Sequence, residues 1–279
     1  MKLANLFGRQ ARRIAVAAII AIFATSYGPT ASAENNKKVT FFILDGTVEP
    51  LSITRPGNPM AGGIITELVE LIFADSEYEI VPKVMPWKRL AVALREDTDW
   101  IIYGFPGGFG PDIPYEFATT PVLSFNHVAI TLRSNDFNIR RAEDVFDRTA
   151  ILVENFHYPG LDPHLTTHLD GRGSGKISSI RAFKPQGALR MLRHRRGDVV
   201  FGYQARMLYQ LHSAGLTLED VRFQDASKII PTNSMYISYS PNMPEAAKQF
   251  INARLTLFSN DGRLAKIVAK YSGPADLLQ

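Results

Sequence analysis

Residues 121–133 read PVLSFNHVAITLR. This stretch is too apolar for a surface loop and too long for an average strand, and its β-branched and aromatic side chains favour an extended chain. We interpret it as a strand that leaves one lobe, crosses a hinge and enters a second lobe. Residues 233–239, NSMYISY, are the candidate return crossing. Two crossings predict a cleft between the lobes; the alternative is that both stretches are core strands of one sheet.

The first 33 residues have the pattern of a bacterial export signal. Basic residues precede an uncharged apolar run over 14–23, and Ala31-Ser32-Ala33 forms a small-residue cleavage pattern. The apolar run is too short to span a bilayer as a mature helix, although a retained anchor is the alternative. We expect cleavage before Glu34 and a periplasmic product. The residues around Arg12-Arg13 match the twin-arginine motif poorly, which favours the general secretion route.

Removal of this segment changes the charge of the chain. The full sequence has a net charge of +4, and residues 1–33 hold four basic and no acidic residues, so the mature chain has no net charge. We therefore expect no nucleic-acid or anionic-membrane partner. The lack of cysteine excludes disulfides, thiolate chemistry and an N-terminal lipid anchor. The remaining 246 residues (279 − 33) suffice for two domains.

The first part of the mature chain alternates strand and helix patterns. Apolar runs over 39–44, 78–84 and 100–103 predict strands, and helical spacing of apolar residues predicts helices over 64–72 and from Trp87 onward. This order predicts an α/β fold with a largely parallel sheet. Two irregular loops, 47–59 and 104–114, are rich in proline or glycine and follow predicted strands, where open α/β sheets place ligands.

The second part of the mature chain also alternates strand and helix patterns. We predict a strand over 149–153, a helix over 186–196 with Gly197 as its left-handed cap, a strand over 199–201 and a helix that ends near Gly215. Helices over 244–258 and after residue 262 are expected to pack back on the first lobe. The predicted domains are residues 34–127 with 232–279, and residues 128–231.

Four motifs follow one another along the mature chain: GIITELVEL over 63–71, PWKRL over 86–90, GDVVFGY over 197–203 and NDGRLAKIVAKY over 260–271. Their order resembles the type II periplasmic solute-binding proteins, specifically the family 3 group that includes amino-acid receptors of ABC importers. The resemblance covers essentially the whole mature chain. It implies two α/β lobes, a two-strand hinge, a small solute held by both lobes and a membrane ABC permease as partner.

Two departures from that group concern the ligand. The group usually carries an arginine in the loop before the first crossing, where it binds a ligand carboxylate, but residues 105–112 contain none. Tyr203 stands where the group usually has an aspartate for the ligand amine. Both departures argue against an ordinary α-amino acid held in the usual way. They leave open an aromatic, neutral or differently charged solute, or a cleft that has lost its original ligand.

The candidate ligand-binding residues lie mainly where predicted strands end. Several have an alternative role. Trp87 either stacks on a solute or packs in the core or between the lobes, and Asp45 either binds the solute or caps a turn. Arg133 either clamps a carboxylate, or is solvated or braces the hinge. The full set is Asp45, Glu49, Trp87, Tyr103, Phe105, Phe125, Arg133, Glu154, Asn155, Phe156, Tyr203 and Gln204.

A metal site is a weak alternative. His164 and His168 would share a helix face, with Asp162 and His157 nearby, but no convincing third ligand follows from the sequence, so we expect no metal. The basic cluster over 190–196 is predicted to be a solvated helix end, with a membrane-partner docking patch as the alternative.

Catalytic motifs are not apparent. The sequence has no nucleophile elbow, phosphate loop or metalloprotease pattern, so we expect no cofactor and no enzyme activity. We predict a monomeric solute-binding protein of an ABC importer. The alternatives are a sensory protein that passes cleft closure to a membrane receptor, and a dehydratase-type lyase with Glu154 or Glu49 as its acid or base.

Overall fold

The computed structural model describes residues 37–45, 48–97, 99–154, 156, 158–166 and 175–272. The predicted signal peptide and Asn155, His157 and His168 lie outside the described residues. The fold is that of the unit Lys38–Gln279. Within the described residues, no helix is both long enough and apolar enough to cross a membrane.

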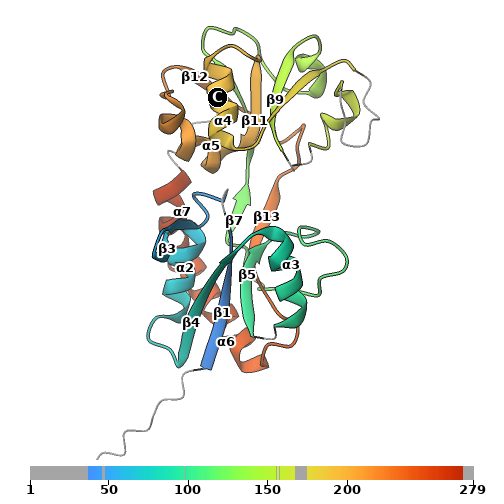
Figure 1. Cartoon of the computed structure of the whole chain (residues 1–279). Helices are drawn as coiled ribbons and strands as arrows, with labels where there is room; N and C mark the ends of the chain where they lie inside the picture. The colour runs from blue at the N-terminus through green and yellow to red at the C-terminus, as the bar shows by residue number, and fades with distance from the viewer. Residues whose placement is uncertain are drawn as a thin grey trace, which may run out of the picture. The chain divides into compact units, whose positions relative to one another are not determined.

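Two large sheets organise the described part of the chain (Figure 1). The first runs in the order β4 (Tyr78–Met85), β1 (Lys37–Leu44), β5 (Trp100–Gly104), β13 (Asn233–Tyr239) and β6 (Glu116–Phe117), and β7 (Leu123–Phe125) also pairs with β13. The second runs in the order β10 (Ser178–Ala182), β9 (Thr149–Val153), β11 (Val199–Tyr203), β8 (His127–Leu132) and β12 (Val221–Asp225). We call these sheets, with the elements packed on them, the first and second lobes.

Both sheets are mixed rather than largely parallel. β1 is parallel to β5, and β9 is parallel to β10 and β11. In contrast, β13 is antiparallel to β5, and β8 is antiparallel to β11 and β12. β8 and β13 are the first strands after the two crossings, and each enters its sheet without an intervening helix.

The hinge differs in detail from the predicted single strand. The stretch over 121–133 divides at Asn126, so that β7 belongs to the first sheet and β8 to the second. β7 pairs with the start of β13, with Phe125 opposite Asn233 and Leu123 opposite Met235, and the two strands run side by side (Figure 1). Residues 121–133 therefore cross from the first sheet to the second. Residues 233–239 lie wholly in the first sheet, so the return crossing is the preceding segment over 226–232 and not the predicted one.

Four helices cover the first sheet among the described residues: α2 (Ile64–Phe73), α3 (Trp87–Glu96), α6 (Glu245–Asn260) and α7 (Arg263–Ser272). Phe41, Ile65 and Trp100 share one buried core with Ile251 and Phe258, so the C-terminal helices pack on the N-terminal strands. Arg254 of α6 also donates hydrogen bonds of 2.9–3.1 Å to the carbonyls of Leu71, Ile72 and Ala74. These are C-terminal carbonyls of α2, which have no partner within that helix.

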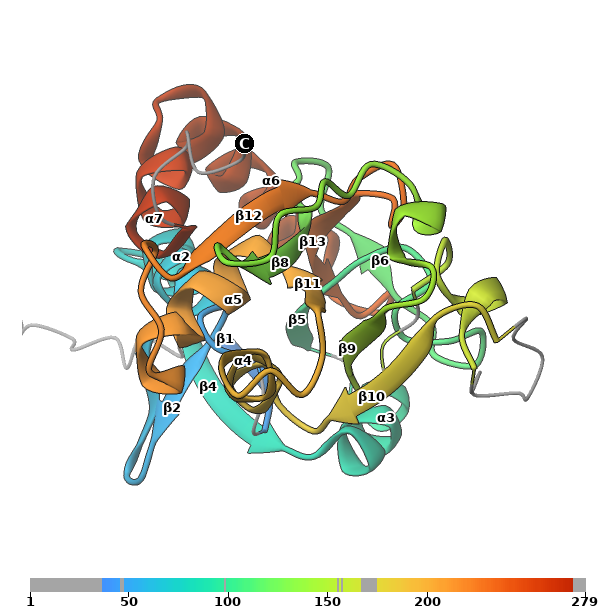
Figure 2. The same ribbon diagram turned by 90° about the horizontal axis from the view of Figure 1, so that it is seen from above.

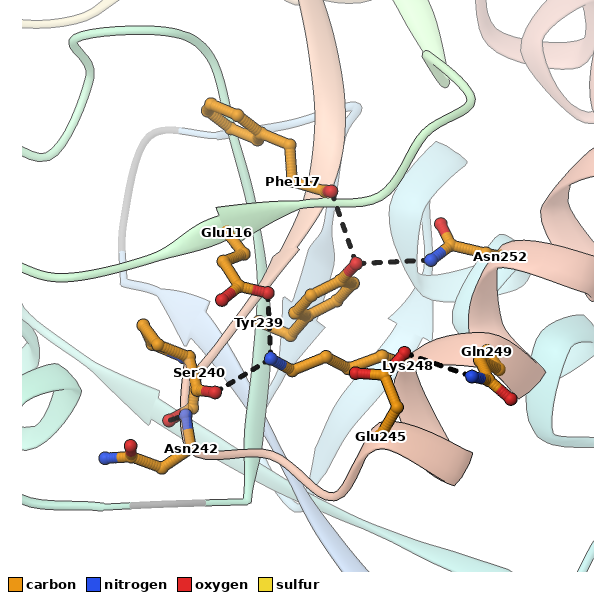
Figure 3. Close-up of polar contacts among 10 residues, drawn as sticks. Glu116, Phe117, Tyr239, Ser240, Asn242, Glu245, Lys248, Gln249 and Asn252 are labelled. Atoms are coloured by element: carbon orange, nitrogen blue, oxygen red, sulfur yellow. Dashed lines mark hydrogen bonds and ion pairs between the residues drawn. The ribbon is translucent and has the colours of Figure 1, made fainter.

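A polar cluster holds α6 on the β6–β13 edge (Figure 3). Lys248 is 8% exposed, and its Nζ donates to Oε2 of Glu116 at 2.8 Å and to the carbonyl of Pro241 at 2.7 Å. The Tyr239 hydroxyl donates to the Phe117 carbonyl and accepts from Nδ2 of Asn252. Glu116 of β6 and the Pro241 carbonyl satisfy the buried ammonium group, whose unpaired burial would be costly.

The second sheet is covered on two sides. α4 (Pro185–Arg193) and α5 (Gln204–Leu211) contribute Leu189, Leu192 and Met207 to one buried cluster and lie on the same side of the sheet (Figure 2). The other cluster contains Val145 of the short 3-10 helix η1 (Ala142–Val145) and Ile229 from an irregular segment. Further short 3-10 helices are η2 (Asp162–His164) and η3 (His212–Ala214).

Several sequence predictions of local structure are wrong. Residues 47–59 are not all loop, because β2 (Ile53–Arg55) and β3 (Asn58–Gly62) form a hairpin whose turn includes Gly57 at φ 73°. The short, partly exposed strands β10 and β12 carry no long apolar run and were not predicted. His164 ends the 3-10 turn η2, so it does not lie on an α-helical face with His168.

The predicted cap of α4 is also wrong. The helix ends at Arg193, and Arg195, at φ 54°, is the left-handed residue. Gly197 has another role, since a Cβ there would lie 2.6 Å from Cγ1 of Ile151. The glycine is therefore required by close packing on β9 and not by backbone conformation. Gly215, in contrast, follows η3 at φ 76°, as a left-handed cap does.

Candidate ligand-binding site

A cavity of about 660 Å³ lies between the two lobes. The first lobe lines it with the end of β1, the start of α3, and the end of β5 with the loop that follows. The lining residues are Leu44, Asp45, Val48, Pro86, Trp87, Leu90, Ile102, Tyr103, Gly104, Phe105, Gly108, Phe109, Val153, Glu154, Phe156, Phe183, Arg206 and Met235. Its volume is within the range of about 300–1,000 Å³ that is typical of small-molecule sites.

Stacked aromatic rings form one wall of the cavity. The rings of Trp87 and Phe109 are 6.1 Å apart and nearly parallel, and Phe109 meets the edge of Tyr115 at 4.9 Å. Gly104 makes this arrangement possible, because a Cβ there would lie 2.5 Å from Cε2 of Phe109. The Trp87 side chain remains 41% exposed. This wall offers a flat apolar surface on which a planar solute can stack.

A second series of rings connects the lobes. Phe125 of β7 meets Phe105 at 6.3 Å and Tyr203 at 4.3 Å, and Tyr203 in turn meets Phe156 at 5.8 Å and His127 at 4.4 Å. Burial lowers the pKa of His127 to about 4, against the opposing effect of a hydrogen bond with the backbone of Pro231. The hinge beside the cavity is therefore built from aromatic contacts around neutral groups.

Arg206 is the charged group that sequence analysis missed. It lies in the first turn of α5, is 6% exposed and also lines the cavity. Its guanidinium carbon is 5.3 Å from the centre of the Phe156 ring. Burial lowers the pKa of Arg206, while Tyr103, Tyr203 and Tyr158 act in the opposite direction. A sequence signal existed, because a cation in a first helical turn is disfavoured by the helix dipole and calls for another explanation.

Tyr103 is the polar group from the first lobe. Its side chain is 9% exposed, and its hydroxyl has no hydrogen-bond partner among the described residues. Burial raises the pKa of this hydroxyl, and the nearby charge of Arg206 opposes the shift. The cavity thus brings together a buried hydroxyl from one lobe and a buried guanidinium from the other.

The predicted site residues divide into three groups. Those that line the cavity are Asp45, Trp87, Tyr103, Phe105, Glu154 and Phe156. Those that line a neighbouring cavity of about 580 Å³ beside α7 are Phe125, Tyr203 and Gln204. Those that line neither are Glu49 and Arg133, and Asn155 lies outside the described residues.

Glu49 and Arg133 are engaged elsewhere. Oε1 of Glu49 pairs with Arg55 at 2.7 Å, and its Oε2 accepts a hydrogen bond of 3.4 Å from Gln210 of α5. Arg133 follows the end of β8 that is remote from the hinge, where its guanidinium donates to the carbonyl of Leu218 at 3.3 Å. Arg133 is therefore exposed and lies away from both the hinge and the cavity, as the solvated interpretation expects.

Alternative chemistry has little support in the described part of the chain. No group of three or more His, Asp or Glu side chains there is arranged to hold a metal, and the His164 ring packs on Phe146 at 5.2 Å. Of the two proposed acid–base residues, Glu154 lines the cavity and Glu49 does not. In the basic cluster, Arg190 donates to the Ser213 carbonyl and Arg195 to the Ser134 hydroxyl.

Comparison with known proteins identifies the fold. No protein-family model and no curated protein matches the sequence. The structure of an ancestral cationic amino acid solute-binding protein, AncCDT-1, matches with a TM-score of 0.66 and 14% identity over 86% of this chain and 97% of that one. A substrate-binding protein of an ABC uptake transporter from Streptococcus pneumoniae, with bound histidine, matches with a TM-score of 0.60 and 17% identity over 88% of this chain and 96% of that one.

A third match is a periplasmic domain of a larger protein. The VFT2 domain of BvgS from Bordetella pertussis (a double mutant) has a TM-score of 0.59 and 19% identity over 84% of this chain and 93% of that one. The chain covers 43% of the larger BvgS periplasmic domain. Together with the two sheets and the two crossings, these matches establish the type II periplasmic solute-binding protein fold. The structures matched are those of binding proteins.

Proposed function

We propose that this chain is an exported, monomeric solute-binding protein that encloses a small organic solute between its lobes and presents the liganded form to a membrane ABC permease. The observation that carries the proposal is the cavity of about 660 Å³, to which both lobes contribute mainly apolar and aromatic side chains. We further propose export with cleavage before Glu34, and lobes made of residues 34–127 with 232–279 and of residues 128–231.

Closure is the physical basis of this function. A solute that contacts Trp87 and Phe109 of the first lobe together with Phe156 of the second gains all its contacts only when the lobes are close. It therefore shifts the population toward the closed form by its difference in affinity for the two forms. The break between β7 and β8 at Asn126 is a natural place for the backbone to absorb the rotation.

A thermal-shift screen of the mature protein tests the proposal. The panel contains amino acids, opines, aromatic acids and polyamines. A true solute at 100 times its Kd adds about 2.7 kcal/mol to the free energy of unfolding, or a rise of about 5–11 °C in Tm for a chain of this length. Solution scattering should show compaction with the same solute. A solute that binds tightly without either response would contradict lobe closure.

Two variants of α3 provide the matched comparison. Trp87→Ala removes the stacking surface and should weaken binding by about tenfold. Val92→Ala truncates an exposed apolar side chain of the same helix, 48% exposed and outside the cavity lining, and should leave the affinity unchanged. Equal affinities of the two variants would place the solute away from the aromatic wall.

Signalling to a membrane receptor is the second candidate, because the chain matches the BvgS VFT2 domain about as well as it matches a transporter component. Cross-linking of the liganded protein in native membranes, followed by mass spectrometry, separates the two: a permease partner supports import and a receptor partner supports signalling. A lyase would be indicated instead by turnover of a prephenate-type substrate that is lost in Glu154→Gln.

A further inference from the structure

We infer that Arg206 and Tyr103 together form an anion-binding site, and that the solute is a monocarboxylate with a flat apolar body. This inference rests on the proposed function and names the class of its solute. Arg206 comes from α5 of the second lobe and Tyr103 from β5 of the first, and both line the same cavity. A carboxylate bound by both groups connects the two lobes.

The Tyr103 hydroxyl is the first observation that points to a ligand. The side chain is more than nine-tenths buried, and its oxygen has neither solvent nor a hydrogen-bond partner within the described residues. A buried polar group without a partner is costly and is uncommon in folded proteins. A ligand oxygen in the cavity would accept the hydrogen bond that this hydroxyl can donate.

Arg206 is the second, independent observation. The residue is 6% exposed, and it lies in the first turn of α5, where the helix dipole disfavours a cation. A guanidinium can donate two parallel hydrogen bonds to one carboxylate, and such charge-assisted bonds are stronger than those to a neutral group. The Phe156 ring, 5.3 Å away, limits the space beside the guanidinium and supports its plane.

The other charges disfavour a second negative charge on the solute. Among the described lining residues, Arg206 is the cation, and Asp45 and Glu154 are exposed acids. The glycine-rich loop over 105–112 adds no basic residue. A second carboxylate on the solute would therefore meet two acids without a second cation. The rest of the lining is aromatic and aliphatic, as the body of an aromatic acid requires.

Matched solute pairs test the inference with the unmodified mature protein. Calorimetry compares 3-phenylpropanoate with 3-phenylpropanamide, and indole-3-acetate with indole-3-acetamide, which differ in charge and hardly in shape. We expect the carboxylates to bind about 10–100-fold more tightly, the range of a charge-assisted hydrogen bond to arginine. Equal affinity of acid and amide would overturn the inference.

Three variants assign this preference to residues. Arg206→Gln should reduce the preference for acid over amide to about threefold or less, and Tyr103→Phe should weaken binding of the acid by about 3–10-fold. Arg190→Gln is the control, because it makes the same change at an exposed arginine of the second lobe. If Arg206→Gln fails to fold, Tyr103→Phe and the acid–amide comparison still test whether the cavity binds a carboxylate. An unchanged preference in folded Arg206→Gln would refute the site.

Failure of this inference is distinguishable from failure of the proposed function. A neutral or cationic solute that raises Tm and compacts the protein, while the aromatic acids do neither, would overturn the anion site and leave solute binding intact. If no solute in the panel, acids included, produces either response, the proposed function falls as well.

Discussion

Replacement of Gly104 by alanine should destabilise the protein through a single side-chain clash. The added Cβ would lie 2.5 and 2.6 Å from Cε2 and Cζ of Phe109 and 3.0 Å from Oγ of Ser238. Carbon atoms do not approach this closely, so the Phe109 ring has to move. Gly104 does not lie in the left-handed region, which makes the effect one of packing and not of backbone strain.

The expected magnitude follows from two opposing terms. Overpacking of a dense core costs about 1–3 kcal/mol, whereas Gly→Ala at a compatible position stabilises by about 0.4–1 kcal/mol. The net loss should be about 1–2 kcal/mol, or about 2–8 °C in Tm. Gly187→Ala, within helix α4, is the control, because the added Cβ would contact only Cβ of Ala182, at 3.7 Å. That variant should gain about 0.5–1 kcal/mol.

A double-mutant cycle identifies the ring responsible. Urea unfolding followed by far-UV circular dichroism is measured for the wild type, Gly104→Ala, Phe109→Ala and the double variant. Phe109→Ala alone should cost about 3–5 kcal/mol, because the residue is buried, with 7% exposure, and belongs to the core of the first lobe. In that background the added methyl group has room, so the coupling energy should be at least about 1 kcal/mol.

The same cycle has a functional readout and a clear negative result. Phe109 stacks on Trp87, so its displacement in Gly104→Ala should also weaken solute binding, whereas Gly187→Ala should not. Additivity of the two changes to within about 0.5 kcal/mol would refute the reasoning, since independent sites behave in that way. It would mean that the ring adjusts without cost and that Gly104 does not position the aromatic wall.

Three further predictions concern stability. Glu116→Gln should lower the free energy of unfolding in urea more than Lys248→Met does (Figure 3). The first variant leaves a buried ammonium without its carboxylate, whereas the second leaves a half-exposed carboxylate in water. The reverse order would contradict this prediction. Arg254→Met should cost about 1–3 kcal/mol by removing three hydrogen bonds to the end of α2, and an unchanged midpoint would show that water replaces them. Burial lowers the pKa of His127 to about 4, from about 6.5 in the unfolded chain, so the contribution of neutral His127 to stability is present above pH 6.5 and is lost as the pH falls from 6.5 to 4. The Tm of His127→Gln should therefore depend less steeply on pH in this range. Equal slopes for the variant and the wild type would contradict this prediction.

The local pattern of apolar residues was sufficient to predict much of the secondary structure of the first lobe. The helical spacing over 64–72 corresponds to α2, and the apolar runs over 78–84 and 100–103 correspond to β4 and β5. These predictions succeed because a helix or a buried strand records its period in consecutive residues. The rule that ligands lie at strand ends has the same local origin, and it selected Trp87 and Phe156, which line the cavity.

Other features depended on contacts between distant residues. The break at Asn126 arises because β7 pairs with β13 while β8 pairs with β11, and no local pattern encodes those partners. The hairpin over 53–62 and the edge strands β10 and β12 are short and partly exposed, so they lack a distinct apolar period.

The sequence by itself therefore determined the two-lobe α/β plan and the order of its elements, since both are recorded in local periodicity and in the order of motifs. Only the tertiary structure decided which side chains share the cavity. Arg206 has the appearance of an ordinary helical arginine until the packing of α5 buries it in the same cavity as Tyr103, which is 103 residues earlier in the chain. Burial and charge pairing are properties of the assembled lobes, because they depend on neighbours that the sequence does not place side by side.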